Sequence, residues 1–100
     1  MNKNDFVWCV GYSGNVAVVN KRARSTYGKL DETELLEKGL LRPAFCTALW
    51  ALEIDKDENR MNVFLQGLSG KIGGKLAIDD AKRMLGVYKV PEGNVRTLSV

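Results

Sequence analysis

The sequence predicts a single domain of the α+β class that spans residues 1–100, and three observations support this prediction. The chain has 100 residues, of which 45% are hydrophobic and 27% are charged, which is the balance of one globular domain. Short apolar segments near both ends are typical of strands, whereas the middle of the chain carries helix signals. We expect the order strand, strand, helix, helix, strand, helix, strand, strand, with a mainly antiparallel sheet packed against a buried central helix.

The first two strands are predicted at residues 6–10 and 16–19. Apolar side chains occupy both alternating sets of positions in the first segment, which is typical of a strand covered on both faces. Gly14 and Asn15 lie between the two segments, and both residue types tolerate the positive φ that a two-residue hairpin turn requires. We therefore expect an antiparallel hairpin here.

Two helices are predicted to follow. Asp31 and Glu34 have the spacing of a capping box, and Gly39 is a suitable C-cap, so the first helix is short. Pro43 suits the first turn of a second helix, because a helix leaves the first backbone N–H groups unpaired in any case. Residues 44–52 are apolar on nearly every side of that helix. This segment is predicted to be the buried centre of the domain.

A third strand is predicted at residues 61–65, where apolar residues again alternate. Residues 67–75 contain four of the ten glycines and are predicted to form a loop or tight turn. The sequence therefore places a change of direction in this part of the chain.

The last third of the chain predicts one more helix and a second hairpin. Residues 81–85 follow two aspartates that suit a helix start, and Gly86 closes the helix. Residues 87–90 and 95–100 are rich in valine and flank a turn at residues 91–94. We expect these two segments to pair as antiparallel strands.

A basic segment directly after the first hairpin is the main candidate for a binding site. We expect residues 21–29 to be irregular, so that their guanidinium and ammonium groups contact phosphate oxygens while a tyrosine stacks on a base. Two lysines of the glycine-rich loop assist if that loop lies nearby. The alternative is a solvated connection whose charges bind nothing. The predicted anion or nucleic-acid site comprises Lys21, Arg22, Arg24, Tyr27, Lys29, Lys71 and Lys75.

Two short motifs fail as predictors of a site. Residues 70–73 have the GxxG form of the loop with which KH domains clamp nucleic acid, but an apparent strand precedes them where that fold has a helix. Ile72 occupies the position where a P-loop has its Ser or Thr. Residues 55–59 match the start of an EF-hand loop, but Arg60 replaces the essential glycine and Gln66 replaces the bidentate Glu.

A helix-turn-helix is a weaker alternative. Its reading helix would be residues 44–52, whose side chains belong in a core. A winged variant uses residues 81–85 as the reading helix, with Lys82 and Arg83 facing DNA and the final hairpin as the wing. The glycines before that helix disrupt the usual helix pair.

The residue types present argue against catalysis. The chain has no histidine, so it lacks Ser-His-Asp and Cys-His chemistry and imidazole metal ligands. Cys9 and Cys46 each lie in apolar surroundings, which indicates buried free thiols in place of a disulfide or a zinc site. We therefore expect no enzyme activity, no cofactor and no metal.

Charge and hydropathy complete the functional expectation. The net charge is +3, and neither a signal peptide nor an apolar run of roughly 18 residues is evident. We expect a cytoplasmic protein with no membrane contact. The sequence predicts a small non-enzymatic binding module for nucleic acid or another phosphate-rich anion. The alternative is a protein-interaction or self-assembling module, hence a homo-oligomer, that uses a free strand edge or exposed apolar side chains.

Overall fold

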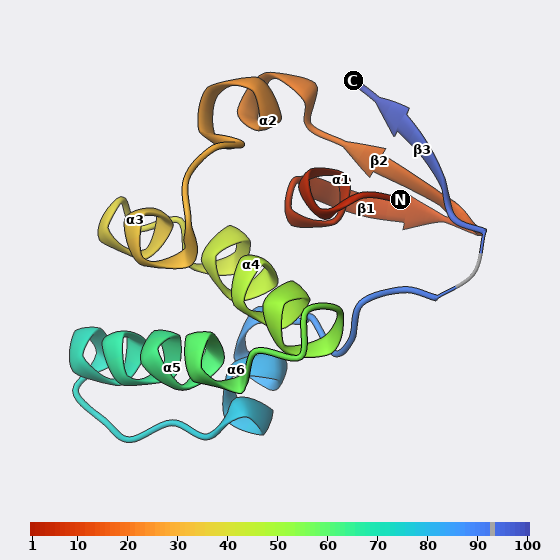
Figure 1. Ribbon diagram of the computed structural model, residues 1–100. Helices are drawn as coiled ribbons and strands as arrows, with labels where there is room; N and C mark the ends of the chain where they lie inside the picture. The colour runs from red at the N-terminus through yellow and green to blue at the C-terminus, as the bar shows by residue number, and fades with distance from the viewer. Residues whose placement is uncertain (93) are drawn as a thin grey trace.

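Six helices and a three-stranded sheet make up the part of the protein that the computed structural model describes, residues 1–92 and 94–100. Figure 1 shows the sheet at one end of the molecule and the longer helices at the other. The α+β class is confirmed, but the strand order is only partly as predicted. In chain order the elements are α1 (Lys3–Val7), β1 (Cys9–Ser13), β2 (Val16–Val19), α2 (Lys21–Tyr27), α3 (Glu32–Glu37), α4 (Leu41–Glu53), α5 (Glu58–Ile72), α6 (Ile78–Leu85) and β3 (Arg96–Ser99).

The sheet is mixed, with β2 in the middle. β2 pairs antiparallel with β1 and parallel with β3. Ser13 pairs with Val16 across the turn, so Gly14 and Asn15 form the predicted two-residue loop, and Gly14 has a φ of +61°. Glycine adopts this conformation without steric cost, which is why the hairpin prediction is confirmed.

The first strand begins later than predicted, because residues 3–7 are helical. The side chain of Asn2 accepts a hydrogen bond from the backbone N–H of Asp5 at 2.9 Å and so caps α1. Phe6 and Val7 are buried within this helix and Trp8 is its buried C-cap, whereas Val10 lies in β1 and is 58% exposed. The prediction of a strand from residue 6 was wrong because local capping prevailed over strand propensity.

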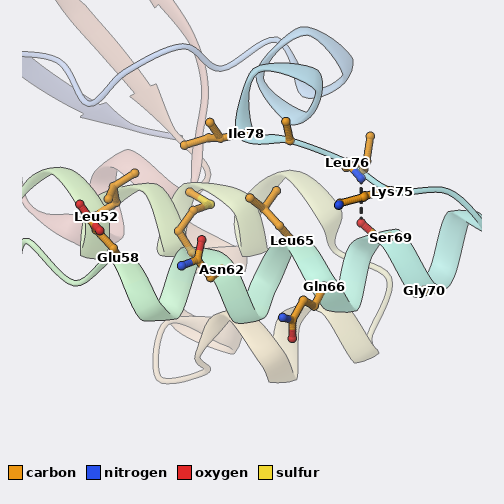
Figure 2. A pocket seen from close by; sticks show the side chains of 12 residues that line it. Leu52, Glu58, Asn62, Leu65, Gln66, Ser69, Gly70, Lys75, Leu76 and Ile78 are labelled. Carbon is orange, nitrogen blue, oxygen red and sulfur yellow. Dashed lines mark hydrogen bonds between the residues drawn. The ribbon is translucent and has the colours of Figure 1, made fainter.

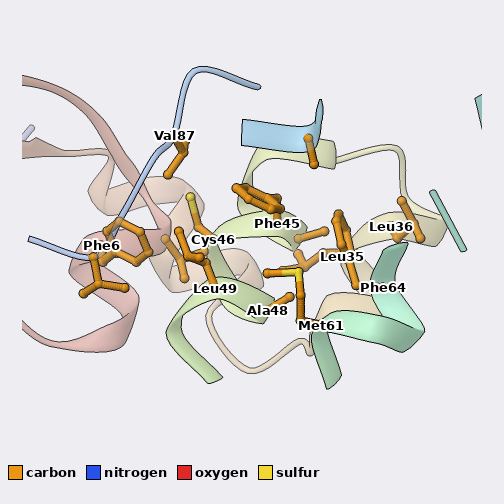
Figure 3. Close-up of a cluster of buried hydrophobic side chains, with 14 of the residues drawn as sticks. Phe6, Leu35, Leu36, Phe45, Cys46, Ala48, Leu49, Met61, Phe64 and Val87 are labelled. Atoms are coloured by element: carbon orange, nitrogen blue, oxygen red, sulfur yellow. The ribbon is translucent and has the colours of Figure 1, made fainter. Parts of the chain in front are cut away.

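The two central helices are confirmed. The side chains of Asp31 and Glu34 each accept a hydrogen bond from the other's backbone, which completes the capping box of α3. After α3, the N–H of Leu40 bonds to the carbonyl of Leu35 at 3.0 Å, which ends the helix as a Schellman motif. α4 packs against α1, α3, α5 and α6, and its side chains fill the core that Figure 3 shows. It is the buried centre of the domain.

The predicted strand at residues 61–65 is wrong, because this segment lies inside α5. Asp57 caps the helix by accepting from the N–H of Arg60 at 3.3 Å. Met61, Phe64 and Leu68 are buried at spacings of three and four, which is the helical period. α5 continues to Ile72, so most of the predicted glycine loop is helix as well.

The predicted second hairpin is also wrong. Residues 87–90 form no strand, because Val87 and Val90 pack into the core and the N–H of Val90 donates to Glu53 Oε1 at 2.9 Å. β3 instead extends the first hairpin, and the N–H of Arg96 bonds to the carbonyl of Asn15 at 3.0 Å. The predicted turn at residues 91–94 includes Gly93, which lies outside the described residues. The predicted helix that Gly86 closes is confirmed as α6.

Two further features concern the chain as a whole. Cys9 and Cys46 are buried free thiols, as predicted. Among the described residues, no helix combines the length and the apolar character that crossing a membrane requires.

Candidate functional site

The basic segment after the hairpin is a helix and not the irregular loop that was predicted. The side chain of Asn20 accepts a hydrogen bond from the N–H of Ala23 at 3.0 Å and thereby starts α2. Lys21 and Arg22 are exposed in its first turn, and Lys29 is exposed just beyond its end. These three cations remain available to a ligand.

The other two residues of the basic segment make internal contacts. Arg24 forms an ion pair with the buried Asp5 and donates to Ser99 Oγ at 3.3 Å. The ring of Tyr27 is half-buried and stacks on Trp8, with ring centroids 5.7 Å apart and planes inclined by 29°. Arg24 and Tyr27 therefore tie α2 to α1 and β3, and Trp8 occupies one face of the Tyr27 ring.

The structure does not bring the two remaining predicted residues to this surface. Lys71 lies in the last turn of α5, and Lys75 lies in the connection that follows it. Figure 1 shows α2 at the top of the view and α5 at the bottom, on the far side of α4. The seven predicted residues thus belong to two separate regions.

A groove runs along α5, and Figure 2 shows it. It has a volume of about 910 Å³. Its walls are one side of α5, the end of α4, and the segment that leads from α5 into α6. Twelve residues line it: Leu52, Glu58, Met61, Asn62, Leu65, Gln66, Ser69, Gly70, Lys75, Leu76, Ala77 and Ile78.

The groove exists because the consecutive helices α5 and α6 do not pack closely against each other. α5 packs against α3 and α4, whereas α6 packs chiefly against α4. Gly73 ends α5 in the left-handed conformation, with a φ of 76°, and turns the chain back along the helix. The N–H of Leu76 then donates to Ser69 Oγ at 3.0 Å, which fixes the returning segment above the groove.

The opposite side of α5 is held firmly by α3. Arg60 donates two hydrogen bonds to the Glu32 carboxylate, from Nε at 2.9 Å and from Nη2 at 2.6 Å. At Gly67 a Cβ atom would lie only 2.8 Å from a methyl group of Leu36, so the absence of a side chain lets α3 approach. These contacts leave the groove side of α5 uncovered.

The Glu32–Arg60 pair is also an electrostatic anchor. Burial alone raises the pKa of the Glu32 carboxyl, but the hydrogen bonds from Arg60 and from the backbone outweigh burial and hold that pKa below its ordinary value. Glu32 is therefore ionised at neutral pH and bonded to a guanidinium that is always charged. This pair sets the position of the N-terminal half of α5.

The groove has an apolar floor and a polar rim. Leu52, Leu65, Leu76 and Ile78 are half-buried and give a ligand apolar surface to cover, and the buried Met61 lies at the bottom of the groove. The rim carries amides, with one carboxylate and one ammonium group among the lining residues. Among the described residues, no three or more His, Cys, Asp or Glu side chains gather as metal ligands. The arrangement suits non-covalent binding of an apolar surface.

The groove residues were missed because their segment was assigned to a strand. A helical signal was present beside the strand pattern, because the apolar residues Met61, Phe64 and Leu68 recur at spacings of three and four. Comparison with protein-family models, with curated proteins and with solved structures found no match. Function must therefore be argued from the geometry of this chain.

Proposed function

We propose that this protein is a non-enzymatic protein-interaction module that binds an amphipathic helix of a partner protein in the groove along α5. One observation carries the proposal: apolar side chains of α5 and of the segment leading into α6 face a common open groove of about 910 Å³. Covering such a surface removes apolar area from water, which is the main driving force of association.

The shape of the groove favours a helix over an extended peptide. Its walls are helices and a loop, so no free strand edge is available to pair with a β-strand. Glu58 and Gly70 mark its ends on α5 and lie twelve positions apart. This corresponds to roughly 18 Å at 1.5 Å per residue, the length of about three helical turns. An occupant helix of this length presents apolar residues at positions i, i+4, i+7 and i+11.

Charge at the two ends of the groove favours one orientation of an occupant helix. Glu58 lies at the end where α5 begins, and Lys75 lies towards the other end, as Figure 2 shows. A partner helix with a basic residue at the Glu58 end and an acidic residue at the Lys75 end matches both charges. Such exposed pairs add little affinity, but they select one orientation and disfavour the reverse.

The proposal is tested with a designed peptide of known sequence. The peptide has about 14 residues, leucine at positions i, i+4, i+7 and i+11, lysine at one end and glutamate at the other, and a fluorescent label. We expect saturable binding in the micromolar range by fluorescence anisotropy, weakened only slightly by 0.5 M salt because the contact is apolar. A peptide with its leucines replaced by serine controls for charge, and equal binding of the two peptides would contradict the proposal.

Substitutions in the groove localise the binding. The double variant Asn62→Arg and Gln66→Arg places bulky charges on the exposed rim, and we expect it to abolish peptide binding without unfolding the protein. Val63→Arg is the matched control, because Val63 is 47% exposed on α5 and does not line the groove. Loss of peptide binding in the control variant would argue against the groove as the binding site.

Light scattering of the protein alone should report a monomer. If it reports a dimer, and the double variant dissociates that dimer, the occupant of the groove is a second copy of this chain instead.

Nucleic-acid or other phosphate binding at α2 is the second candidate function. It is favoured by the exposure of Lys21, Arg22 and Lys29, none of which forms an ion pair within the described part of the chain. Replacing the three by alanine should weaken binding to single- or double-stranded nucleic acid and reduce the salt dependence of the binding that remains. Unchanged retention of the triple variant on heparin would reject this function.

A further inference from the structure

A second, smaller cavity lies beside the first turns of α4, away from the groove along α5. It has a volume of about 130 Å³. Arg42 and Cys46 of α4 line it, together with β1 residues and the segment of residues 86–91 that follows α6. The groove meets α4 only near its last turn, at Leu52. The two sites are therefore independent.

The floor of this cavity is apolar and uncharged. Phe6, Cys9, Cys46 and Val87 are all buried, and Figure 3 shows Phe6, Cys46 and Val87 close to one another. Burial raises the pKa of the Cys46 thiol to about 12, so the thiol is neutral at physiological pH. Thiols and hydrocarbon groups offer at most weak hydrogen bonds. The floor therefore suits a hydrocarbon group. It does not suit an ion, because it offers no strong hydrogen bonds to replace those that the ion makes with water.

The rim of the cavity is cationic. Arg42 and Lys89 lie on it with two tyrosines, Tyr12 and Tyr88, and none of the lining residues is acidic. Neither cation forms an ion pair within the described part of the chain. Burial and the neighbouring Cys9 thiol raise the pKa of Tyr12 to about 12, so its hydroxyl remains a hydrogen-bond donor. The rim thus offers positive charge and donors without a competing carboxylate.

The wall formed by residues 86–91 is fixed by the core. Val87 and Val90 are 7% and 4% exposed, and the N–H of Val90 donates to Glu53 Oε1 at 2.9 Å. The cavity is therefore part of the packed fold.

We propose that this cavity binds a small organic carboxylate, with its short hydrocarbon chain on the thiol-lined floor and its carboxylate between Arg42 and Lys89. Arginine and lysine form charge-assisted hydrogen bonds with carboxylates. The volume of about 130 Å³ equals about four water volumes at roughly 30 Å³ each, enough for a chain of about three or four carbons. A longer chain has no room on the floor.

The test is an NMR titration of the ¹⁵N-labelled protein with sodium butyrate at constant ionic strength. We expect saturable, millimolar binding with shifts confined to residues 86–91, β1 and the first turns of α4. Acetate should bind more weakly, octanoate no more tightly, and butyramide not detectably. Three results would overturn the proposal. These are an affinity that keeps rising with chain length up to octanoate, binding of butyramide as tight as that of butyrate, and binding of phosphate as tight as that of butyrate.

Matched variants separate the site from general charge effects. Arg42→Gln and Lys89→Gln should each weaken butyrate binding about tenfold or more, because each removes a charge-assisted hydrogen bond. Lys38→Gln removes the same charge from an exposed position outside the cavity and should leave binding unchanged. Equal weakening in all three variants would show that butyrate responds to net charge and would reject the site.

Discussion

The surface of α2 and the groove along α5 differ in how much of their chemistry the fold itself uses. On α2, Arg24 is paired with Asp5 and Tyr27 is stacked on Trp8, so two of the seven predicted binding residues hold the structure together. Along α5, apolar residues that resemble core residues in the sequence line an open groove. The type of a side chain therefore indicates a binding site only where that side chain is not already bonded or packed within the fold.

The largest expected effect is a difference in stability between substitutions on the buried side and on the groove-facing side of α5. Phe64 is 2% exposed and packs on Phe45 with ring centroids 5.8 Å apart, whereas Leu65 is half-buried beside the groove. We expect Phe64→Ala to lower the free energy of unfolding by about 3–5 kcal/mol. Leu65→Ala should cost only about 1–2 kcal/mol, because less area is returned to water. Denaturant unfolding measures the loss of unfolding free energy in both variants. Equal losses would mean that Leu65 is as buried as Phe64 and does not face an open groove.

The next largest effect concerns the Glu32–Arg60 pair, which anchors α5 to α3 on the side opposite the groove. Arg60→Ala leaves the Glu32 carboxylate buried without its partner, and we expect a loss of about 2–3 kcal/mol in unfolding free energy. This lies below the range for fully buried pairs because the Arg60 side chain is 33% exposed. Lys71→Ala on the same helix is the control, and it should not change stability. A negligible loss for Arg60→Ala would contradict the anchoring role.

The same pair predicts a pH dependence. The pKa of Glu32 is lowered in the folded state, so its stabilising contribution is complete above the unfolded value of about 4.3 and is lost as the pH falls through the folded pKa. The difference in stability between the natural protein and the Arg60→Ala variant should therefore shrink as the pH is lowered from about 5 through the acid range in which Glu32 becomes protonated. Urea unfolding across this range measures the difference, and a constant difference would reject the electrostatic explanation.

A smaller effect tests the internal role of Arg24. Arg24→Ala leaves Asp5, whose side chain is 10% exposed, without its cation, and we expect a loss of about 1–2 kcal/mol. Arg22→Ala removes the same charge from an exposed position of α2 and should leave stability unchanged. Thermal unfolding compares the two variants. If both behaved alike, the two basic residues would be equivalent and Arg24 would be as available to a ligand as Arg22.

Local signals explain what the sequence could predict. The capping box at Asp31 and Glu34, the turn at Gly14 and the closing Gly86 act through neighbouring residues, and all three predictions are confirmed. The α+β class and the buried α4 followed from composition and an apolar stretch.

Features that depend on distant partners were not predictable from one chain. Apolar residues at 61, 63 and 65 fit the alternation of a strand, whereas those at 61, 64 and 68 fit the helical period, and the helix is the one that packs against α3 and α4. β3 pairs parallel with β2 through contacts between opposite ends of the chain. The groove was not predicted from the sequence, because part of α5 was assigned to a strand and the segment that follows it was assigned to a loop.

The most direct test of the groove as a binding site is an NMR titration of the ¹⁵N-labelled protein with the designed amphipathic peptide. We expect the largest shift changes on the groove-facing residues of α5 and on residues 75–78, and no shift changes at the amides of α2. Shift changes centred on α2 or on the strands of the sheet, or no saturable change at millimolar peptide, would contradict the assignment of the groove as the binding site.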